Sequence, residues 1–423
     1  MLNSRLDAMV SPLLEWRRNL KTQWHGKSLA KQIAGSLSGR ADRRVRVAFL
    51  MVENQKWSSQ SIYEALAADP VFEPVVLAST HVANANDSRQ IRTTLADNLA
   101  FATAKGLNAQ AAFDQNTGRF IALQQFAPDV VFYEQPYGLP VEHQPRTVGQ
   151  FALTCYVPYG YGIYLAKNSG QKKTRGFSEY IWRTFLETRE FLRDADQLAL
   201  LNTAGAAATG YPKMDAYVRA LATMRRDVSD HRASPQVVYA PHHSVVAGHP
   251  DSYGTFAWSG RWLLAYAQQN PQIRWIFKPH PKLKESLVAS GAMSLTEAEA
   301  YFSAWDGLSN TRSIYDGEYL DAFVESDAMI TDSGSFLLEY LLTGQPMLLL
   351  KSASSAGYSD YGNRIAQALY QAGDVEQIQS FLSQVVSAGN DPRKPERVAL
   401  MPALTPTAGQ AVVKCLKSAL QLS

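Results

Sequence analysis

The segment from Ala328 to Pro346, read as AMITDSGSFLLEYLLTGQP, places a strand, a turn and a helix within nineteen residues. The apolar residues Ala328–Ile330 predict the end of a buried strand, and the apolar run Phe336–Leu342 predicts a buried helix. Gly344, with Pro346 beyond it, predicts where this helix ends. A strand joined to a helix by so short a turn is the building block of parallel α/β folds.

The turn at the start of this predicted helix is suited to binding an anion. Its backbone N–H groups and hydroxyls would converge at the positive end of the helix dipole, where phosphate is the usual anion. A carboxylate one helical turn farther on could bind sugar hydroxyls. We therefore predict a donor site made by Asp332, Ser333, Gly334, Ser335 and Glu339. The alternative is a helix capped by Ser333 or Ser335 without a ligand.

Short apolar strands alternate with helices along most of the chain, which predicts parallel sheets with helices on both faces. The strands are expected at Val45–Val52, Pro74–Ala78, Asp129–Tyr133, Phe151–Val157, Gln197–Leu201, Val237–Ala240, Ile273–Phe277, Ala328–Ile330 and Met347–Leu350. The other helices are expected at Ser61–Ala68, Asp87–Leu107, Ile181–Leu192, Trp258–Gln269 and Ala408–Leu420. The stretch Ala289–Tyr315 is expected to be a helical insertion or a loop.

These two series of strands predict an α/β fold with two doubly wound domains and a cleft between them. At 423 residues the chain is long for one core, and its hydrophobic fraction of 46% supports a large folded interior. We place the domains at 44–228 and 229–406, with a basic helical extension at 1–43. The last helix, in 407–423, is expected to pack back on the first domain.

The N-terminal 46 residues have a marked net positive charge. They contain ten lysines and arginines against three acidic residues, whereas the whole chain has a formal charge of +3. Leu6, Val10, Leu13 and Leu20 recur near helical spacing, so the segment predicts a basic amphipathic helix. We predict that residues 1–46 lie on an anionic membrane surface, outside the active site. The alternative is a helix packed on the body of the protein with a solvated basic face.

No apolar run approaches the ~20 residues that span a bilayer, and the N-terminus lacks the apolar core of a secretory signal. The two cysteines, Cys155 and Cys415, predict neither a disulfide framework nor a metal site. We therefore expect a cytoplasmic protein that is peripheral at the inner face of the cell membrane and has no nucleic acid partner.

Two more polar motifs follow predicted strands of the second half. They are His242 and His243 after the strand at 237–240, and Lys278 and His280 after the strand at 273–277. Because the carboxyl ends of parallel strands line the ligand crevice of an open α/β sheet, both motifs and the turn at 332–335 are expected to converge. Histidine suits general-base catalysis near neutral pH, and two flanking prolines would hold His280 rigidly.

Each of these residues has an alternative role. The histidines could be hydrogen-bonded loop residues, and Lys278 could pair with a structural carboxylate instead of phosphate. Three histidines could also bind a metal, but their spacing has no helical pair of the HExxH kind and no cysteine assists them. We therefore predict neither a metal nor a cofactor.

Four sequence blocks resemble the CDP-glycerol glycerophosphotransferase family, which includes teichoic acid polymerases and related capsule enzymes. They are TGYPKMD (Thr209–Asp215), VYAPHHS (Val238–Ser244), FKPHPKL (Phe277–Leu283) and ITDSGSFLLEYLLTGQP (Ile330–Pro346). The resemblance covers roughly the second half of the chain. It implies a GT-B fold with two Rossmann-like domains, the first for the acceptor and the second for the nucleotide donor. It also implies transfer from a cytidine-nucleotide donor to a growing polymer at the inner membrane face.

The resemblance also implies roles for single residues. It places His280 on the family's catalytic-domain histidine and Ser335 on a serine that binds the donor phosphate. Glu339 falls where the helix of that motif carries an acidic residue. Gly210 and Tyr211, in the first block, are implied to contact the donor nucleotide.

The chain departs from the family at two places. The first serine of the last motif is Gly334 here, and the aromatic residue of that motif is Ser333. The Trp-His-Gly block of the teichoic acid enzymes is absent from the comparable strand exit, which reads TCYVPYGYG (Thr154–Gly162). We predict an acceptor site at Tyr159 and Tyr161 in this loop, because their aromatic faces suit sugar rings. The alternative is a glycine-rich turn with packed tyrosines.

We therefore predict a transferase that moves a glycerol-phosphate or sugar(-phosphate) unit from a nucleotide-activated donor, CDP- or CMP-linked by resemblance, to a polysaccharide or lipid-linked acceptor. One of the three histidines would deprotonate the acceptor hydroxyl, while Lys278 and the turn at 333–335 stabilise the departing nucleotide phosphate. Two alternatives stay open. One is an enzyme like UDP-N-acetylglucosamine 2-epimerase, which shares the fold and a similar Asp-Ser-Gly-Gly turn. The other is a non-catalytic subunit that binds nucleotide sugars or glycans.

Overall fold

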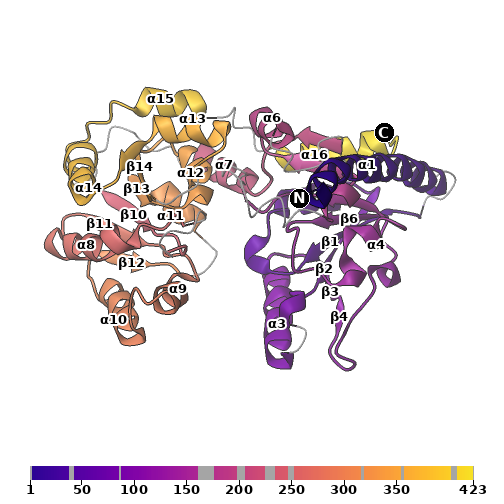
Figure 1. Cartoon of the computed structure of the whole chain (residues 1–423), viewed down its shortest axis with the longest axis horizontal. Helices are drawn as coiled ribbons and strands as arrows, with labels where there is room; N and C mark the ends of the chain where they lie inside the picture. Colours follow the sequence, from indigo (N-terminus) through magenta and orange to yellow (C-terminus); the bar gives the residue numbers. More distant parts are fainter. Residues whose placement is uncertain are drawn as a thin grey trace. The chain divides into compact units, whose positions relative to one another are not determined.

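The structure is a computed structural model of the chain. It describes residues 2–37, 42–84, 87–160, 176–197, 205–223, 234–245, 252–315, 319–353, 357–401 and 407–422. The chain forms two compact units (Figure 1). Unit 1 comprises Met1–Tyr161, Ala166–Ala216 and Thr405–Ser423, and unit 2 comprises Gly162–Leu165 and Tyr217–Leu404. The chain changes unit within helix α7 (Met214–Thr223), ahead of the boundary placed at residue 228 from the sequence.

Unit 1 is built on a parallel sheet of seven strands in the order β3-β2-β1-β6-β7-β8-β9. The strands are β1 (Val45–Met51), β2 (Phe72–Ala78), β3 (Ala109–Ala111), β6 (Val130–Tyr133), β7 (Leu153–Tyr156), β8 (Arg183–Leu186) and β9 (Ala206–Ala208). A separate antiparallel pair is formed by β4 (Phe113–Asp114) and β5 (Arg119–Phe120). Along β1, Val47 and Phe49 join one apolar cluster, and Ala48 and Leu50 join another. Both faces of the sheet are therefore buried, as in doubly wound folds.

Helices cover both faces of this sheet. They are α1 (Leu2–Leu37), α2 (Gln60–Ala67), α3 (Ser88–Ala104), α4 (Pro145–Val148), α6 (Arg189–Gln197) and α16 (Ala408–Ala419). Short 3₁₀ turns are η1 (Asn54–Lys56), η2 (Val82–Asn84), η3 (Leu123–Phe126), η4 (Val141–His143) and η5 (Ser178–Tyr180). Leu29 of α1, Leu66 of α2 and Leu416 of α16 share one apolar cluster. Helices from opposite ends of the chain, α1 and α16, thus pack on the same side of the sheet (Figure 1).

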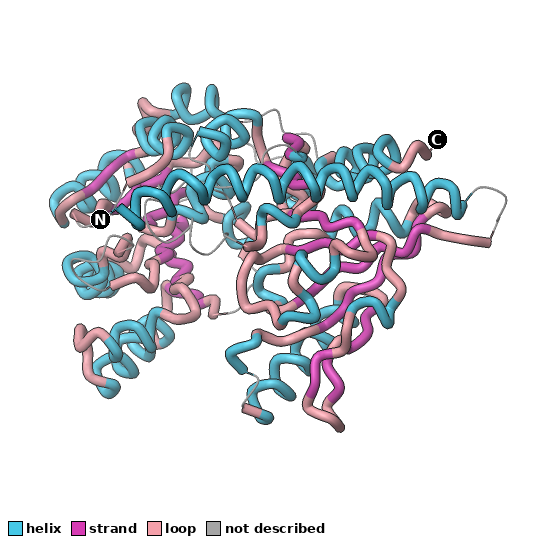
Figure 2. Tube along the Cα trace, turned by 45° about the vertical axis from the view of Figure 1, so that its right-hand side comes forward, coloured by secondary structure: helices cyan, strands magenta, loops and turns pink. Residues whose placement is uncertain are grey.

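The second half of α1 belongs to the core of unit 1. Figure 2 shows α1 as one unbroken helix, and its residues Leu29, Ala30 and Ile33 are at most 9% exposed. The Thr22 hydroxyl donates a hydrogen bond to the Glu179 carbonyl at 2.7 Å. The idea of an extension that stands apart from the folded body is therefore wrong for this half of the helix. This half agrees with the alternative of a helix packed on the body of the protein, because the apolar residues that pack against unit 1 lie after residue 28.

The structure also corrects the prediction for residues 181–201. The stretch predicted as a helix contains β8 and the start of α6. Trp182, Phe185 and Leu186 are buried, and so short an apolar run does not distinguish a buried strand from a helix. The strand predicted at Gln197–Leu201 lies outside the described residues except for Gln197, which ends α6.

Unit 2 is built on a parallel sheet of six strands in the order β12-β11-β10-β13-β14-β15. The strands are β10 (Gln236–Ala240), β11 (Arg274–Phe277), β12 (Thr311–Ser313), β13 (Ala328–Thr331), β14 (Met347–Leu350) and β15 (Tyr370–Ala372). The helices are α8 (Phe256–Gln269), α9 (Leu283–Ala289), α10 (Leu295–Asp306), α11 (Leu320–Glu325), α12 (Gly334–Leu341), α13 (Asp360–Ala368), α14 (Val375–Ser380), the π-helix η7 (Phe381–Ser387) and α15 (Lys394–Leu400). The stretch expected to be an insertion or loop holds α10 and β12, and Ser294 and Glu297 form a capping box at the start of α10.

Among the described residues, no helix combines the length and apolar character needed to cross a membrane. Both cysteines are free thiols. Burial in β7 raises the pKa of the Cys155 thiol well above its usual range, which makes this cysteine unreactive.

Candidate active site

The candidate site lies at the carboxyl edge of the unit 2 sheet. There β11, β10 and β13 end side by side, and the strand order reverses between β10 and β13. Backbone pairing continues past the strands, since the His280 N–H donates to the Pro241 carbonyl at 3.0 Å. The Thr331 hydroxyl donates to the Ala240 carbonyl at 2.7 Å. The three motifs expected to converge therefore lie together, at the switch point where open α/β sheets bind ligands.

Asp332 holds two of these segments in place. It is 1% exposed, and its Oδ1 accepts the His242 N–H at 2.6 Å. Its Oδ2 accepts the N–H and the hydroxyl of Thr255, just ahead of α8, at 2.6 and 2.8 Å. Burial raises the pKa of Asp332 to about 6, against the hydrogen bonds from Thr255 and His242. Both oxygens thus accept protein donors, and Asp332 positions the loop that carries His242. The sequence reasoning missed Thr255, although its place just ahead of a helix marks it as a capping residue.

Three imidazole rings, from His242, His243 and His280, cluster at this edge. The ring centroids of His243 and His280 are 4.0 Å apart, those of His242 and His243 4.4 Å, and those of His242 and His280 5.4 Å. One ring nitrogen from each histidine lies within 4.8 Å of the other two. By distance alone, this cluster is suited to a metal ion, which the spacing in the sequence did not indicate.

The hydrogen bonds of two rings show which nitrogen carries the proton. The Ser244 hydroxyl accepts two backbone N–H groups, at 2.9 and 3.3 Å, so it donates its own proton to Nδ1 of His242 at 2.7 Å. Nδ1 of His280 accepts the Lys282 N–H at 3.1 Å. A neutral imidazole whose Nδ1 is an acceptor carries its proton on Nε2. Both rings therefore offer an N–H donor at Nε2 instead of the lone pair that a metal needs.

His243 differs from the other two histidines. Its Nδ1 is buried and has no hydrogen-bond partner among the residues that the structure describes. This ring is free to carry its proton on Nδ1 and to keep a lone pair on Nε2. The cluster therefore suits two N–H donors and one base better than it suits a metal.

All three rings are neutral at pH 7. Burial, together with the neighbouring histidines, lowers the pKa of His242 to about 3. Burial, together with His243, Lys278 and Lys282, lowers the pKa of His280 to about 3. Burial and Lys282 also lower the pKa of His243. Neutral imidazole can donate a hydrogen bond with one nitrogen and accept a proton with the other, whereas imidazolium can only donate.

The start of α12 follows β13 at the same edge. Ser333 occupies the N-cap position, but its side chain makes no capping hydrogen bond. Its N–H donates to the Thr331 hydroxyl oxygen at 3.0 Å, Gly334 is buried and Ser335 is exposed. The side chain of Ser333 thus does not cap α12, and the exposed Ser335 hydroxyl lies at the positive end of the helix dipole, which is the end that attracts anions.

Lys278 and Glu339 both contact Tyr319. Lys278 is 4% exposed, and its Nζ lies 5.6 Å from the centroid of the Tyr319 ring. The Tyr319 hydroxyl donates to Oε2 of Glu339 at 2.6 Å, and Glu339 is 2% exposed. Lys278 and Glu339 are therefore buried beneath the site, and both contact Tyr319, which the sequence reasoning did not include. Its place at the start of α11, ahead of an apolar run, gave no chemical signal.

Gly210 and Tyr211 lie in unit 1. The Tyr211 hydroxyl donates to the Tyr159 carbonyl, and the φ of Gly210 is +89°. Asp215, in the same block, accepts the N–H groups of Ala408 and Gly409 at 3.1 and 2.9 Å. The TGYPKMD block thus fastens the start of α16 to unit 1, a structural role that the sequence reasoning missed.

Tyr159 lies at the carboxyl edge of the unit 1 sheet, after β7. It is 37% exposed, and its hydroxyl shares a hydrogen bond of 2.9 Å with that of Tyr137. Nζ of Lys56 lies 4.5 Å from the Tyr137 ring centroid and 5.4 Å from that of Tyr159. Tyr161 lies outside the described residues. Tyr159 of the predicted acceptor loop is therefore joined by Tyr137 and Lys56 from two other segments, which the sequence reasoning missed.

Unit 1 also has a buried carboxyl group at this edge. Glu134 follows β6, is 4% exposed, and accepts the N–H and the hydroxyl of Ser58 on Oε1 at 2.7 and 3.2 Å. Burial raises its pKa to about 7, against the hydrogen bonds from Ser58. Its surroundings resemble those of Asp332 in unit 2.

Residues 198–359 match the family described as CDP-Glycerol:Poly(glycerophosphate) glycerophosphotransferase. The resemblance to this family is confirmed. The matched stretch contains the histidine cluster, Lys278 and the start of α12, and it supports a transferase. No curated protein shows significant similarity to the chain.

Several solved structures share the fold. The UDP-GlcNAc 2-epimerase from Neisseria meningitidis, bound to UDP-GlcNAc, aligns with a TM-score of 0.59 at 13% identity over 89% of this chain and 100% of that one. A variant of the wall teichoic acid polymerase TagF aligns with a TM-score of 0.56 at 11% identity over 97% of this chain and 98% of that one. A TagF crystal soaked with CDPG gives 0.55 at 12% identity, with the same coverage. These similarities show a GT-B type fold with Rossmann-like domains.

Proposed function

We propose that this protein transfers a glycerol-phosphate or sugar(-phosphate) unit from a cytidine-nucleotide donor, CDP- or CMP-linked, to a polysaccharide acceptor such as a capsule or teichoic acid-like polymer. The convergence of a three-histidine cluster and the start of α12 at the unit 2 switch point carries this proposal. We place the protein in the cytoplasm, at the inner face of the membrane, where a lipid-linked acceptor is available.

The chemistry follows from the tautomers of the cluster. The start of α12 with Ser335 binds the donor phosphates, and the Nε2–H groups of His242 and His280 donate to the phosphate oxygens as negative charge develops. His243 accepts the proton of the acceptor hydroxyl. For transfer of a glycerol phosphate or sugar phosphate from a CDP-linked donor, the acceptor oxygen bonds to the β-phosphorus, the bond from that phosphorus to the bridging oxygen breaks, and CMP leaves. For transfer of a sugar, the acceptor oxygen bonds to the anomeric carbon, the bond from that carbon to the phosphate oxygen breaks, and the nucleotide leaves. Tyr159 and Tyr137 of unit 1 offer aromatic faces to the acceptor.

The test compares three variants of unit 2 with a matched control. Ser335→Ala is expected to weaken CDP binding, measured as a smaller rise in melting temperature with CDP, because the folded state alone binds the ligand. His243→Ala and His280→Ala are expected to lower turnover by roughly two to four decades with the fold retained. Ser303→Ala, at an exposed serine of α10, is the control and should change neither.

Near-wild-type turnover of both histidine variants would remove the catalytic assignment. Stabilisation by UDP but not CDP would contradict the cytidine donor. Conversion of UDP-N-acetylglucosamine without any acceptor would point to an epimerase, and donor binding without turnover on any acceptor would point to a binding subunit.

A further inference from the structure

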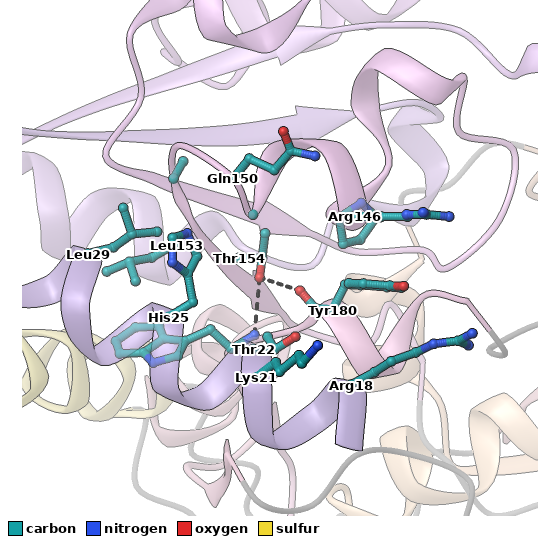
Figure 3. A pocket seen from close by; sticks show the side chains of 15 residues that line it. Arg18, Lys21, Thr22, His25, Leu29, Arg146, Gln150, Leu153, Thr154 and Tyr180 are labelled. Atoms are coloured by element: carbon teal, nitrogen blue, oxygen red, sulfur yellow. Dashed lines mark hydrogen bonds between the residues drawn. The ribbon is translucent and has the colours of Figure 1, made fainter. Parts of the chain in front are cut away.

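A pocket of about 390 Å³ lies in unit 1 (Figure 3). It is bounded by α1, by the connection from α4 to β7, and by the residues between η5 and β8. Ala152, Leu153 and Thr154 line it at the amino end of β7, whereas Tyr159 follows the carboxyl end of the same strand. The pocket is therefore distinct from the predicted acceptor loop.

Basic side chains line this pocket. Arg18, Lys21 and His25 of α1 follow one another at three and four residues and so share one helix face, and Arg146 comes from α4. In Figure 3 the side chains of Arg18 and Arg146 extend to the same side of the pocket. No lining residue is acidic. Outside the lining, Oε1 of Glu179 lies 3.8 Å from a guanidinium nitrogen of the half-exposed Arg18.

The floor of the pocket is apolar or already hydrogen-bonded. Leu29, Leu153 and Trp182 are buried, and the Thr154 hydroxyl donates to the Tyr180 carbonyl at 2.7 Å and accepts the Trp182 N–H at 3.1 Å. The pocket thus combines a cationic mouth with an apolar floor. Arginine binds phosphate oxygens through paired N–H groups, so a phosphate attached to an apolar group suits both parts.

The outer face of α1 beside the pocket carries exposed apolar residues. Trp16, Leu20 and Trp24, spaced four residues apart, are 58%, 47% and 80% exposed. Tryptophan is enriched at the boundary between lipid and water, and helices that lie on membranes combine such residues with lysine and arginine. A lipid surface under this stripe would bring its phosphate groups to the level of Lys21, next to Leu20 in the helix.

From these features we propose that the pocket between α1 and α4 binds the phosphate headgroup of an anionic lipid while Trp16, Leu20 and Trp24 enter the lipid surface. This inference rests on the membrane association proposed above and names its site. It makes Arg146, which lies outside α1, a lipid-binding residue. If α1 were attracted to the membrane only by its overall charge, Arg146 would not contact the lipid.

The test uses the full chain and vesicles of phosphatidylcholine with or without 25% phosphatidylglycerol at 0.15 M salt. Lys21→Glu and Arg146→Glu, in the pocket, are each expected to lower binding to the anionic vesicles at least tenfold. The matched control is Lys27→Glu, an exposed lysine of α1 that does not line the pocket, with an expected loss of threefold or less. An equal loss in all three variants would show diffuse charge attraction and would overturn the pocket.

A second measurement separates a lipid from free phosphate. Short-chain dihexanoylphosphatidylglycerol, below its micelle concentration, should raise the melting temperature of the wild type but not of Arg146→Glu. Inorganic phosphate that stabilises the wild type as strongly would overturn the lipid assignment. The rise in melting temperature with CDP, measured on the same wild-type samples, reports on the nucleotide site alone. The two proposals can therefore fail independently.

Discussion

A chain that begins at Asp42 and lacks α1 is expected to lose much of its stability. Leu29, Ala30 and Ile33 of α1 are 9%, 4% and 7% exposed, and they belong to the same apolar cluster as the α16 residues Val412 and Leu416. Removing the helix would expose these partners together with the face of the sheet below them. The change therefore tests whether α1 is part of the fold.

The magnitude follows from the buried contacts. Burying a leucine or isoleucine side chain contributes about 1.5–3 kcal/mol, so Leu29 and Ile33 together contribute about 3–6 kcal/mol. The hydrogen bonds from Thr22 to Glu179 and from Gln23 to Trp182, at 2.7 and 2.9 Å, add about 1 kcal/mol each. The loss of about 5–8 kcal/mol is comparable with the whole stability of many domains, about 5–15 kcal/mol.

Calorimetry of the full and shortened chains measures this loss. At about 2–4 °C per kcal/mol, the unit 1 transition should fall by at least ~10 °C or disappear. Gly26→Ala tests the same packing without a deletion, because a Cβ there would lie 2.1 Å from Cδ1 of Trp182. Gly35→Ala, where a Cβ would meet nothing within 4 Å, is its control and should keep or slightly raise the melting temperature. A shortened chain that melts within ~2 °C of the full chain would refute the reasoning.

Two further predictions concern unit 2. Asp332→Asn would turn an NH₂ group toward one of the N–H donors of His242 or Thr255, so we expect a loss of about 1–3 kcal/mol in urea unfolding together with weaker CDP binding; unchanged values would contradict its positioning role. Acid should destabilise the fold through His242 and His280, whose pKa of about 3 lies below that of an exposed histidine, ~6.5. The two histidines cost the fold no stability above about pH 6.5. As the pH falls from there toward 3, they lower the free energy of unfolding, because the unfolded chain takes up the protons first. Asp332, with a pKa raised to about 6, acts in the opposite sense. The melting temperature should therefore fall less between pH 7 and pH 5 in a His242→Gln, His280→Gln variant than in the wild type, and parallel curves would refute the assignment.

Much of the unit 2 site could be predicted from the sequence because its motifs directly follow strands. A strand exit is visible as an apolar run followed by polar residues, so the positions of His242, Lys278, His280 and Asp332 at one edge were readable. The order of the strands in the sheet could not be read in this way, since it depends on which strands pair although they lie far apart in the sequence. The adjacency of β11, β10 and β13 is therefore a finding of the structure. The tautomers of the histidines could also be assigned only from the structure, because they follow from the hydrogen bonds that Ser244 and Lys282 make to the ring nitrogens.

The sequence prediction failed where one pattern serves two environments. Helical spacing of apolar residues fits a membrane surface as well as a protein core, so α1 could not be placed from its sequence. The structure shows that one helix contributes Ile33 to the core and leaves Trp24 exposed. The buried strand β8 was mistaken for a helix for a similar reason, because Trp182 and Phe185 belong to an apolar run too short to show a period.

Both units have a buried carboxylate at the carboxyl edge of the sheet, and comparing the two shows which residues belong to the fold and which to the proposed chemistry. In unit 2, Asp332 crosses the switch point from β13 to hold Thr255 ahead of α8. In unit 1, Glu134 crosses the corresponding point from β6 to hold Ser58 ahead of α2. Each carboxylate accepts both an N–H and a hydroxyl from the segment that leads into the helix after the central strand. Because the described residues of unit 1 have this arrangement without a histidine cluster, the carboxylate belongs to the architecture of the doubly wound sheet. The chemistry we propose therefore depends on what unit 2 adds, which is the three imidazole rings and the start of α12 with its exposed Ser335.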